Sequence, residues 1–559
     1  MKKISKIMLF LFLSVFTFEG CSNLLDVDSN RLVFPAGYQM NAANDTLYST
    51  FGIFSQLQKL ADSYVLLGEL RGDLMDVTPT SNLYLKEINN FEISANNPFT
   101  NNIKDYYSVI NNCNYVIHNI DTSVVKGGIK VMYKEYAACK AIRAWTYMQI
   151  AMNYGSAQYY DKPILTIQDA ENVQKSAPMT LTDLAPILIN DLSPWKDIAT
   201  PTTGFIFTQN ISQSYFPIRF LLGDLYLWTG QYENAANEYR DLMFKSKYIV
   251  SSFYRNTLTV TNNAFTGGFF IYNLGTFSVE NITNIAATNQ YGRKFQLDSL
   301  ALNHMIAPSN LSVNTWKSQM YYFSAKLDTM IDLRLYSSVS ALYKFTSSNQ
   351  SAGTSQQSIY SSMITPTSTN YLFKIIAMNP EMPNINTNKQ IMPYRVPLLY
   401  LRYAEAVNRL GKPNLAMAVL KNGLNNATLN NKKIVPQSEK GTTVPNYMNF
   451  SDLRFDTNIG IRMRGCGNVN LDTTFYVIPN QVKLTMMNTD STKYVEDLIV
   501  QELALETAFD GNRFQDLMRV AIRRNDNSYL ANIVASKYTS NKEAIRTKLL
   551  DRTKWYLTK

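Results

Sequence analysis

The stretch Gln213–Phe244 constrains the fold of this chain more than any other, because its pattern is that of two short helices folded back on each other. Gly223 follows a leucine, Tyr226 lies three residues later, Gly230 stands where the chain must turn, and Ala235 comes twelve residues after Gly223. Small residues at such positions let two helices touch, and the spacing is that of a tetratricopeptide unit. The pattern predicts a helical hairpin with Gly223 and Ala235 at the contact.

The same spacing occurs again in Leu399–Leu424. There Ala404, Gly411 and Ala416 stand in the places of the first glycine, the turn glycine and the alanine. A unit of this kind cannot bury its apolar face alone, so other helices must stack against it. We therefore predict a mainly α fold, in which tetratricopeptide-like repeats pack against an irregular, loop-rich part with a few short strands.

The N-terminus has the order of a secretory signal. A basic start precedes the apolar run Ile7–Phe18, which is shorter than the roughly 20 residues of a membrane-spanning helix. We predict a lipoprotein signal over residues 1–20, an acylated Cys21 as the mature N-terminus and a tether over residues 21–30. Glu19 and the phenylalanine before it depart from a strict lipobox, so a conventional cleaved signal is the alternative.

The charge pattern argues against nucleic acid as a partner. The formal net charge is +10, but lysines and arginines are scattered along the chain in short clusters only. A nucleic-acid-binding protein concentrates its positive charge on one face or stripe. A mixed, solvated surface is the simpler interpretation.

Neither a metal centre nor a catalytic triad is indicated. Cys113, Cys139 and Cys466 form no close Cys-x-x-Cys pair, and the two histidines, His118 and His304, lie far apart in the sequence. We expect the first two cysteines to be buried apolar residues, with a disulfide left open. No metal and no cofactor are expected.

Apolar residues recur at helical spacing over residues 44–60, 99–120, 130–154 and 181–192. Gly155 supplies a stop for the third of these predicted helices.

Three carboxylates follow the first predicted helix. Glu69, Asp73 and Asp76 are spaced i, i+4 and i+7, so they share one face if the stretch is helical. Paired carboxylates can perform acid–base chemistry or bind calcium, although a structural or solvated acidic face is more common. A glycosidase is one alternative function, but its two carboxyl groups must stand about 5–10 Å apart in a cleft, and helical spacing supplies no opposing walls.

The sequence changes character after Tyr248. Short β-prone runs at Gly268–Tyr272 and Tyr371–Ile376 are separated by loops rich in Asn, Ser and Thr. Long irregular inserts in compact domains commonly carry function. We therefore expect ligand contacts in the insert, residues 249–393.

Charged residues stand among apolar helix positions near the end of the chain. Glu502 and Glu506 are spaced i, i+4 on the apolar side of a predicted helix, and Arg513 and Arg519 follow the turn at Gly511. Buried charges are almost always paired. The pattern predicts a buried ion network that fastens the last helices to the repeats.

These stretches resemble the RagB/SusD family of outer-membrane nutrient-binding lipoproteins of Bacteroidetes. The closing motif is the most specific, with Glu502, Glu506, Phe509, Gly511, Arg513, Asp516, Leu517 and Arg519 in register. The chain departs from the family pattern at Leu503 and Asp510, where arginine and glutamate are usual. Other family-like stretches are Asp105–Ile117, residues 141–155 before Lys162–Leu165, Asp332–Arg334 and Tyr394–Gly411.

The resemblance implies a helical body with about four tetratricopeptide units, a loop-rich ligand-binding part and no enzymatic activity. It also implies capture of glycans or peptides at the outer membrane, outside the cell, together with a TonB-dependent transporter of the SusC type. We expect one body over residues 31–559. Its parts are helical repeats at approximately 130–248 and 394–425, the insert 249–393 and a C-terminal helical segment 495–559.

A saccharide site needs exposed aromatic rings beside amide and carboxylate groups. Two regions of the sequence offer this combination, and ligand sites of the family draw on the same parts of the chain. The candidates are Asp73, Tyr84 and Asn101 in the early region and Trp316, Tyr321 and Tyr322 in the insert. We predict that Trp316 and a neighbour stack on a saccharide while Asp73 or Asn101 hydrogen-bonds to it, with weak affinity on the order of micromolar to millimolar. A peptide ligand and a scaffold that binds only protein are the alternatives.

Overall fold

The computed structural model describes most of the chain. The described residues are 43–201, 205–206, 209–251, 258–261, 264–267, 280–287, 295–319, 321–323, 326–328, 332–339, 369–378, 389–466, 476–479 and 488–557. The predicted signal, Cys21, the tether and the β-prone run Gly268–Tyr272 lie outside these residues.

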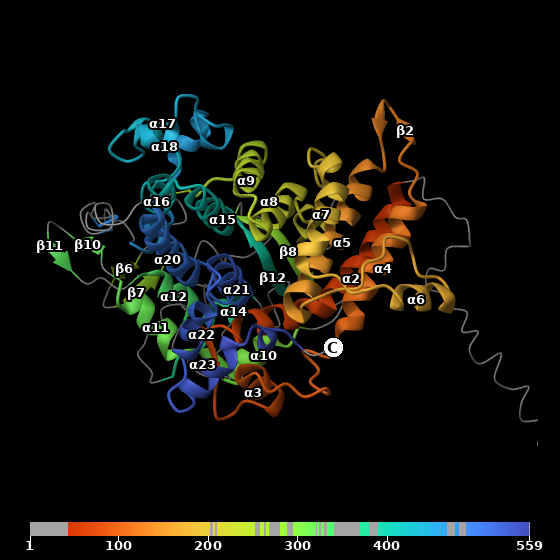
Figure 1. Cartoon of the computed structure of the whole chain (residues 1–559), viewed down its shortest axis with the longest axis horizontal. Helices are drawn as coiled ribbons and strands as arrows, with labels where there is room; N and C mark the ends of the chain where they lie inside the picture. The colour runs from red at the N-terminus through yellow and green to blue at the C-terminus, as the bar shows by residue number, and fades with distance from the viewer. Residues whose placement is uncertain are drawn as a thin grey trace, which may run out of the picture.

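Two stacked helical hairpins form the centre of the repeat layer. The first consists of α8 (Ile218–Thr229) and α9 (Tyr232–Ser246), and the second of α15 (Val396–Arg409) and α16 (Pro413–Lys421). α9 packs directly on α15, although the insert separates the two hairpins in sequence (Figure 1). Both predicted hairpins are therefore present, and their mutual packing buries the faces that neither hairpin could cover alone.

Further helices extend the row on the N-terminal side. α7 (Leu181–Leu192) packs against α8 and against α5 (Tyr133–Tyr154), and α5 pairs with α4 (Ile103–Asn119). Gly155 ends α5 with φ 81°, in the left-handed conformation that glycine adopts without strain. The mainly α repeat fold predicted from the sequence is confirmed.

Small residues set the geometry of the first hairpin. Gly230 turns the chain with φ 81°. Gly223 faces Tyr239, because an added Cβ would lie 2.3 Å from Cε1 of that ring. The ring is itself held in place, since Tyr239 Oη donates to Asp224 Oδ1 at 2.6 Å. Ala235 is fully buried in the same hairpin.

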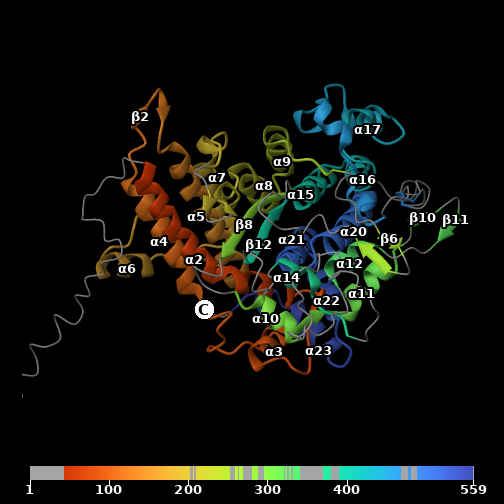
Figure 2. The ribbon, with the colours of Figure 1, turned by 180° about the vertical axis from the view of Figure 1, so that it is seen from behind.

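The C-terminal helices form a second part behind the repeats. They are α20 (Asn488–Glu506), α21 (Arg513–Arg524), α22 (Asn527–Ala535) and α23 (Lys542–Leu550). α20 packs on α15 and α16, while α21 packs on the long first helix, α2 (Ala43–Glu69). Figure 2 shows α20 and α21 between the repeat helices and the short helices of the insert.

Strands among the described residues occur only as antiparallel pairs. β8 (Asn281–Ala287) pairs with β12 (Lys389–Arg395), which leads straight into α15. β1 (Met75–Val77) pairs with β9 (Ile306–Pro308) and so joins the early region to the insert. The other pairs are β2 (Val125–Lys126) with β3 (Ile129–Lys130), β4 (Phe205–Ile206) with β5 (Gln209–Asn210), β6 (Leu258–Thr261) with β7 (Ala264–Gly267), and β10 (Tyr321–Phe323) with β11 (Lys326–Asp328).

The remaining described elements are short. The α-helices are α3 (Leu83–Asn90), α6 (Ile167–Gln174), α10 (Leu297–Leu302), α11 (Asn310–Lys317), α12 (Arg334–Ser338), α14 (Phe373–Met378), α17 (Asn426–Asn430) and α18 (Gln437–Lys440). The 3₁₀ turns are η1 (Ser193–Trp195), η2 (Ile211–Ser214), η5 (Asn446–Met448), η6 (Leu453–Thr457), η7 (Ile461–Gly465) and η8 (Arg552–Trp555).

The prediction of a strand at Tyr371–Ile376 is wrong, because most of this run lies in helix α14. The helical turn buries Leu372, Phe373 and Ile376 in the core and lets the buried Lys374 donate to the Ala508 carbonyl at 2.8 Å. Packing against α10 and α12 thus outweighs the local β preference of the side chains.

Candidate functional site

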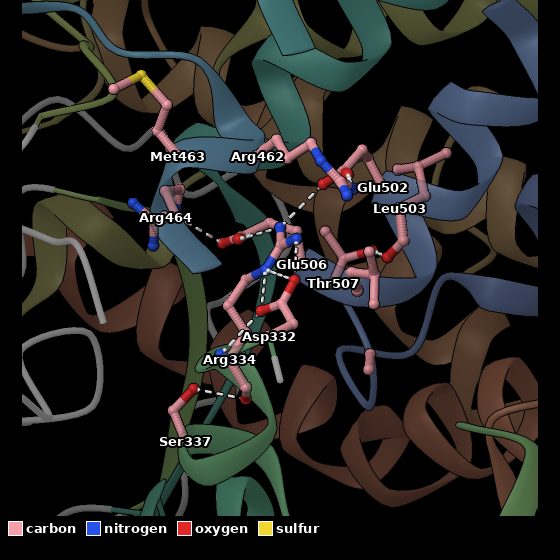
Figure 3. A network of polar contacts seen from close by, with 12 residues as sticks. Asp332, Arg334, Ser337, Arg462, Met463, Arg464, Glu502, Leu503, Glu506 and Thr507 are labelled. Atoms are coloured by element: carbon pink, nitrogen blue, oxygen red, sulfur yellow. Dashed lines mark hydrogen bonds and ion pairs between the residues drawn. The ribbon is translucent and has the colours of Figure 1, made fainter. Parts of the chain in front are cut away.

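Glu502 and Glu506, near the end of α20, face arginines from η7 and from the insert (Figure 3). Glu502 accepts hydrogen bonds from Arg462 Nη1 and Arg334 Nη1, each at 3.0 Å. Glu506 accepts from Arg464 Nε at 3.1 Å and from Arg334 Nη1 at 3.3 Å. All five side chains are buried. One ion network therefore fastens α20, η7 and the insert to one another.

The electrostatics of this network favour its charged form. Burial raises the pKa of Glu506, but Arg464, Arg334 and Arg395 outweigh burial and hold that pKa below its ordinary value. Burial lowers the pKa of Arg334, yet Asp332 and the facing glutamates raise it well above its ordinary value. These charges satisfy each other in the interior, so the network is structural.

A second buried group of charges joins the second hairpin to α21. Arg519 Nη2 lies 2.6 Å from Glu405 Oε2, and Arg519 Nη1 lies 3.0 Å from Asp516 Oδ1. Asp516 Oδ1 also forms an ion pair with Arg402 Nη1 on α15, at a distance of 2.5 Å. Breaking one member of such a buried group leaves an uncompensated charge, which is strongly destabilising.

The three early carboxylates do not share a helix face, because α2 ends at Glu69 and Asp76 lies in β1. Glu69 Oε1 accepts from the backbone N–H of Gly511 at 2.8 Å. Asp73 forms a two-pronged pair with Arg513, with distances of 2.6 and 3.0 Å. The prediction of one acidic face is wrong, because the chain turns after α2. Glu69 and Asp73 then contact different residues of the closing motif, Gly511 and Arg513.

Trp316 and Tyr321 lie in the interior, each only 1% exposed. Trp316 Nε1 donates to the Leu505 carbonyl at 3.2 Å, and Tyr321 Oη donates to Asp332 Oδ2 at 2.7 Å. Neither ring is open to solvent in this structure. The backbone of Tyr322 lies in β10, whereas its side chain falls outside the described part of the chain.

The pairing of β1 with β9 places the region of Asp73, Tyr84 and Asn101 beside the insert. A single ligand site built from both candidate regions needs them to be neighbours. Ser309 Oγ donates to the Asp73 carbonyl at 2.6 Å, and Thr80 Oγ1 donates to the His304 carbonyl at 2.8 Å. Ser81 Oγ donates to the Met305 carbonyl at 2.5 Å. These bonds hold the segment that leads into α3 against the insert.

Tyr84 and Asn101 lie on one exposed surface. Tyr84 is 37% exposed, and it is the one exposed large aromatic side chain among the described residues. Asn97 connects the two residues, because its Nδ2 donates to the Tyr84 carbonyl at 2.9 Å and its carbonyl accepts from the Asn101 N–H at 2.9 Å. Leu83 beside the ring is 66% exposed. We call Asn82, Leu83, Tyr84 and Asn101 the Tyr84 surface.

The C-terminal helices hold the base of this surface. The buried Lys537 Nζ donates to the Leu70 and Met75 carbonyls at 2.6 and 2.9 Å and to Asn89 Oδ1 at 2.8 Å. Lys548 Nζ donates to the Asn90 carbonyl at 3.1 Å. Burial lowers the pKa of Lys537 to about 8, although Asp76 and neighbouring carboxylates oppose the shift. The segment that carries Tyr84 is thus fastened at both ends.

The described residues contain neither a metal-binding cluster nor a membrane-spanning helix. No cluster of three or more His, Cys, Asp or Glu side chains there could hold a metal ion. No helix there combines the length and the apolar character needed to cross a membrane. Cys113, Cys139 and Cys466 are buried and form no disulfide among the described residues. The burial of the first two agrees with the prediction.

The fold defines a class: a helical-repeat protein whose loop-rich part is joined to the repeats by buried ion pairs. A model of the SusD family matches residues 289–554. No curated protein sequence matches the chain. Residues 289–554 therefore match the SusD family, and the solved structures below share the fold of the chain.

Solved structures share the fold along most of the chain. A SusD superfamily protein from Bacteroides vulgatus ATCC 8482 has a TM-score of 0.58 at 15% identity, covering 91% of this chain and 93% of that one. A SusD-like carbohydrate-binding protein from Bacteroides fragilis NCTC 9343 has a TM-score of 0.56 at 15% identity, with coverages of 87% and 88%. A laminarin-binding SusD-like protein has a TM-score of 0.53 at 14% identity, with coverages of 90% and 95%.

Proposed function

We propose that this protein is a lipoprotein of the cell surface that binds an oligosaccharide nutrient and delivers it to a TonB-dependent outer-membrane transporter of the SusC type. The observation that carries the proposal is the Tyr84 surface, an exposed aromatic ring beside amide groups on a SusD fold. Two proteins of the same fold, described as carbohydrate-binding and laminarin-binding, support a glycan as the ligand class.

The chemistry of the Tyr84 surface suits a sugar chain. A phenol ring offers an apolar face to the C–H groups of a sugar and a hydroxyl to its polar edge. Asn82 and Asn101 are also exposed. Asn82 Oδ1 caps α3 by accepting from the Leu85 N–H, but its amide N–H groups and the Asn101 amide can pair with sugar hydroxyls. The surface is shallow, so we expect weak binding, on the order of micromolar to millimolar.

We further propose that the protein binds its glycan without cleaving it. A glycosidase needs two free carboxyl groups facing each other across a cleft. Glu69 is fully buried against Gly511, and Asp73 is paired with Arg513. Asp76 Oδ1 caps the backbone N–H of Val77. The early carboxylates therefore have structural partners.

Calorimetric titration with laminarihexaose, maltohexaose, xylohexaose and mannohexaose tests the proposal. At least one of these should bind the native protein, and Tyr84→Ala should weaken that binding at least about tenfold through loss of the stacking face. Ile167→Ala removes an 82% exposed apolar side chain on α6 and serves as the matched control, which should bind normally.

Unchanged affinity of Tyr84→Ala would remove Tyr84 from the site. Failure of all four glycans, with binding of a peptide mixture instead, would favour the peptide alternative. Release of reducing sugar from any of them would contradict the non-enzymatic assignment.

A further inference from the structure

The chain between α16 and η6 builds a small lobe with its own depression. α17 and residues 440–451 form its walls, and the depression has a volume of about 500 Å³. Sites for small molecules usually measure about 300–1,000 Å³. In both views the lobe with α17 projects at the end of the molecule opposite to α3, which carries Tyr84 (Figures 1 and 2).

Side-chain amides dominate the rim of this depression. Asn426, Asn430, Asn446 and Asn449 all line it and are all exposed. Part of this amide capacity is used in hydrogen bonds within the protein, and the remaining N–H and carbonyl groups can pair with hydroxyl groups, which also donate and accept. Among the residues that line the depression, Lys440 alone is charged, which disfavours a cationic ligand.

The floor is apolar. Leu429, Met448 and Phe450 line the depression from below and are buried. Val444 stands at the rim and is 55% exposed. An apolar floor beneath a ring of amides is complementary to a sugar, whose C–H groups and hydroxyls point in different directions.

The repeat hairpins hold the walls in place. Arg240 Nε on α9 donates to the Asn449 carbonyl at 2.9 Å, and Asn446 Nδ2 donates to Asp241 Oδ1 at 3.2 Å. On α17, Asn430 Nδ2 donates to Asn426 Oδ1 at 2.8 Å. Walls that are ordered before binding lower the entropic cost of taking up a ligand.

We infer that this depression, the α17 pocket, is a second saccharide site that takes one or two rings of a neutral glycan. The inference rests on the proposed function for the ligand class, but not on the Tyr84 surface. Two sites at opposite ends of the molecule let one long glycan bind at both or let a short one bind at either, and a chain that spans them gains avidity.

The test uses the four hexasaccharides named above and three variants of the full-length protein. In Tyr84→Ala, at least one glycan should still bind weakly through the α17 pocket. Adding Asn430→Ala and Asn446→Ala to that variant should reduce this residual affinity about tenfold or more, because two amide partners are lost. Both asparagines are exposed, so an unchanged melting temperature should show that the fold is intact.

Asn172→Ala in the Tyr84→Ala background is the matched control. Its amide also bonds along a helix, accepting from Gln168 Nε2 at 3.2 Å on α6, but lies far from the depression in sequence. The control should leave the residual affinity unchanged.

Loss of all binding in Tyr84→Ala, while the native protein binds, overturns the α17 pocket and leaves the proposed function standing. Equal residual affinity with and without the two asparagine substitutions also overturns it. Absence of binding by the native protein to all four glycans overturns both proposals together.

Discussion

Glu69 shows how one residue can link a buried contact to pH. Its carboxyl is fully buried at the end of α2 and accepts from the Gly511 N–H at 2.8 Å. Burial raises the pKa of Glu69 from 4.5 to about 7, against the opposing effect of that hydrogen bond. Between these two pH values the folded state holds more protons than the unfolded state. The free energy of unfolding must therefore fall as pH rises through this window.

Glu69→Gln should remove this dependence while keeping an acceptor for the Gly511 N–H. We expect the variant to match the native protein near pH 4.5 and to exceed its free energy of unfolding at pH 8 by up to about 3 kcal/mol. Urea unfolding at pH 4.5, 6 and 8 measures the difference. Glu543→Gln, at a residue exposed on α23, is the control and should show no such trend. A gain of the same size at every pH would mean that the charge of Glu69 is not its cause.

Within the helices, two glycines differ in the space that surrounds them. Gly223 in α8 lies against the ring of Tyr239, which its hydroxyl bond to Asp224 keeps from moving aside. Among the described residues, an added Cβ on Gly52 in α2 would meet no atom within 4 Å outside the backbone of its own helix. The helical environment is the same, so only the neighbouring helix distinguishes the two positions.

Gly223→Ala should destabilise the protein by roughly 1–3 kcal/mol, because the new methyl group overpacks the hairpin. Gly52→Ala should instead stabilise it by about 0.5–1 kcal/mol through lower backbone entropy in the unfolded chain. Thermal unfolding of the two variants and of the native protein measures whether each substitution lowers or raises the stability. A stabilising Gly223→Ala would contradict the close contact of α8 with α9.

At the scale of the whole molecule, segments far apart in sequence are joined by buried polar contacts. Arg513 on α21 pairs with Asp73, and Arg464 bonds to Glu280 at 2.5 Å. Lys537 bonds to Leu70, at the end of α2, and to Asn89 within α3. These contacts tie the early region, the insert and the C-terminal helices to one core. We therefore expect the proposed glycan surface to keep its shape without the ligand.

Anchoring belongs to this scale too. We predict that Cys21→Ala releases the protein from the outer membrane, because the several acyl chains of a lipoprotein each contribute about 0.8 kcal/mol per buried methylene. Fractionation of cells without the partner transporter measures this, with the native protein as the membrane-bound control. A Cys21→Ala protein that still sediments with the outer membrane would refute the lipid anchor.

Local spacing in the sequence is enough to predict the repeat hairpins and a buried ion network in the closing motif, but not the partners of its charges. Tyr84 is a candidate because an aromatic ring stands there among asparagine and threonine residues. In α3, Leu85 and Ile88 are buried at i, i+3, which leaves Leu83 and Tyr84 on the open face, a signal readable from the sequence. No pattern in the sequence indicates that Asn97 connects Tyr84 to Asn101 through hydrogen bonds.

Tertiary structure alone decided the rest, because burial is a property of the assembled core. Trp316 and Tyr321 stand in polar sequence surroundings, yet the core takes both rings, and no local pattern records that α20 and η7 will cover them. The same holds where Gly68 meets Gly511: an added Cβ on Gly68 would lie 1.9 Å from the Gly511 oxygen. This close approach holds the end of α2 against the closing motif. Glu69 and Asp73 therefore bond to different residues of that motif, each more than four hundred residues away in the sequence.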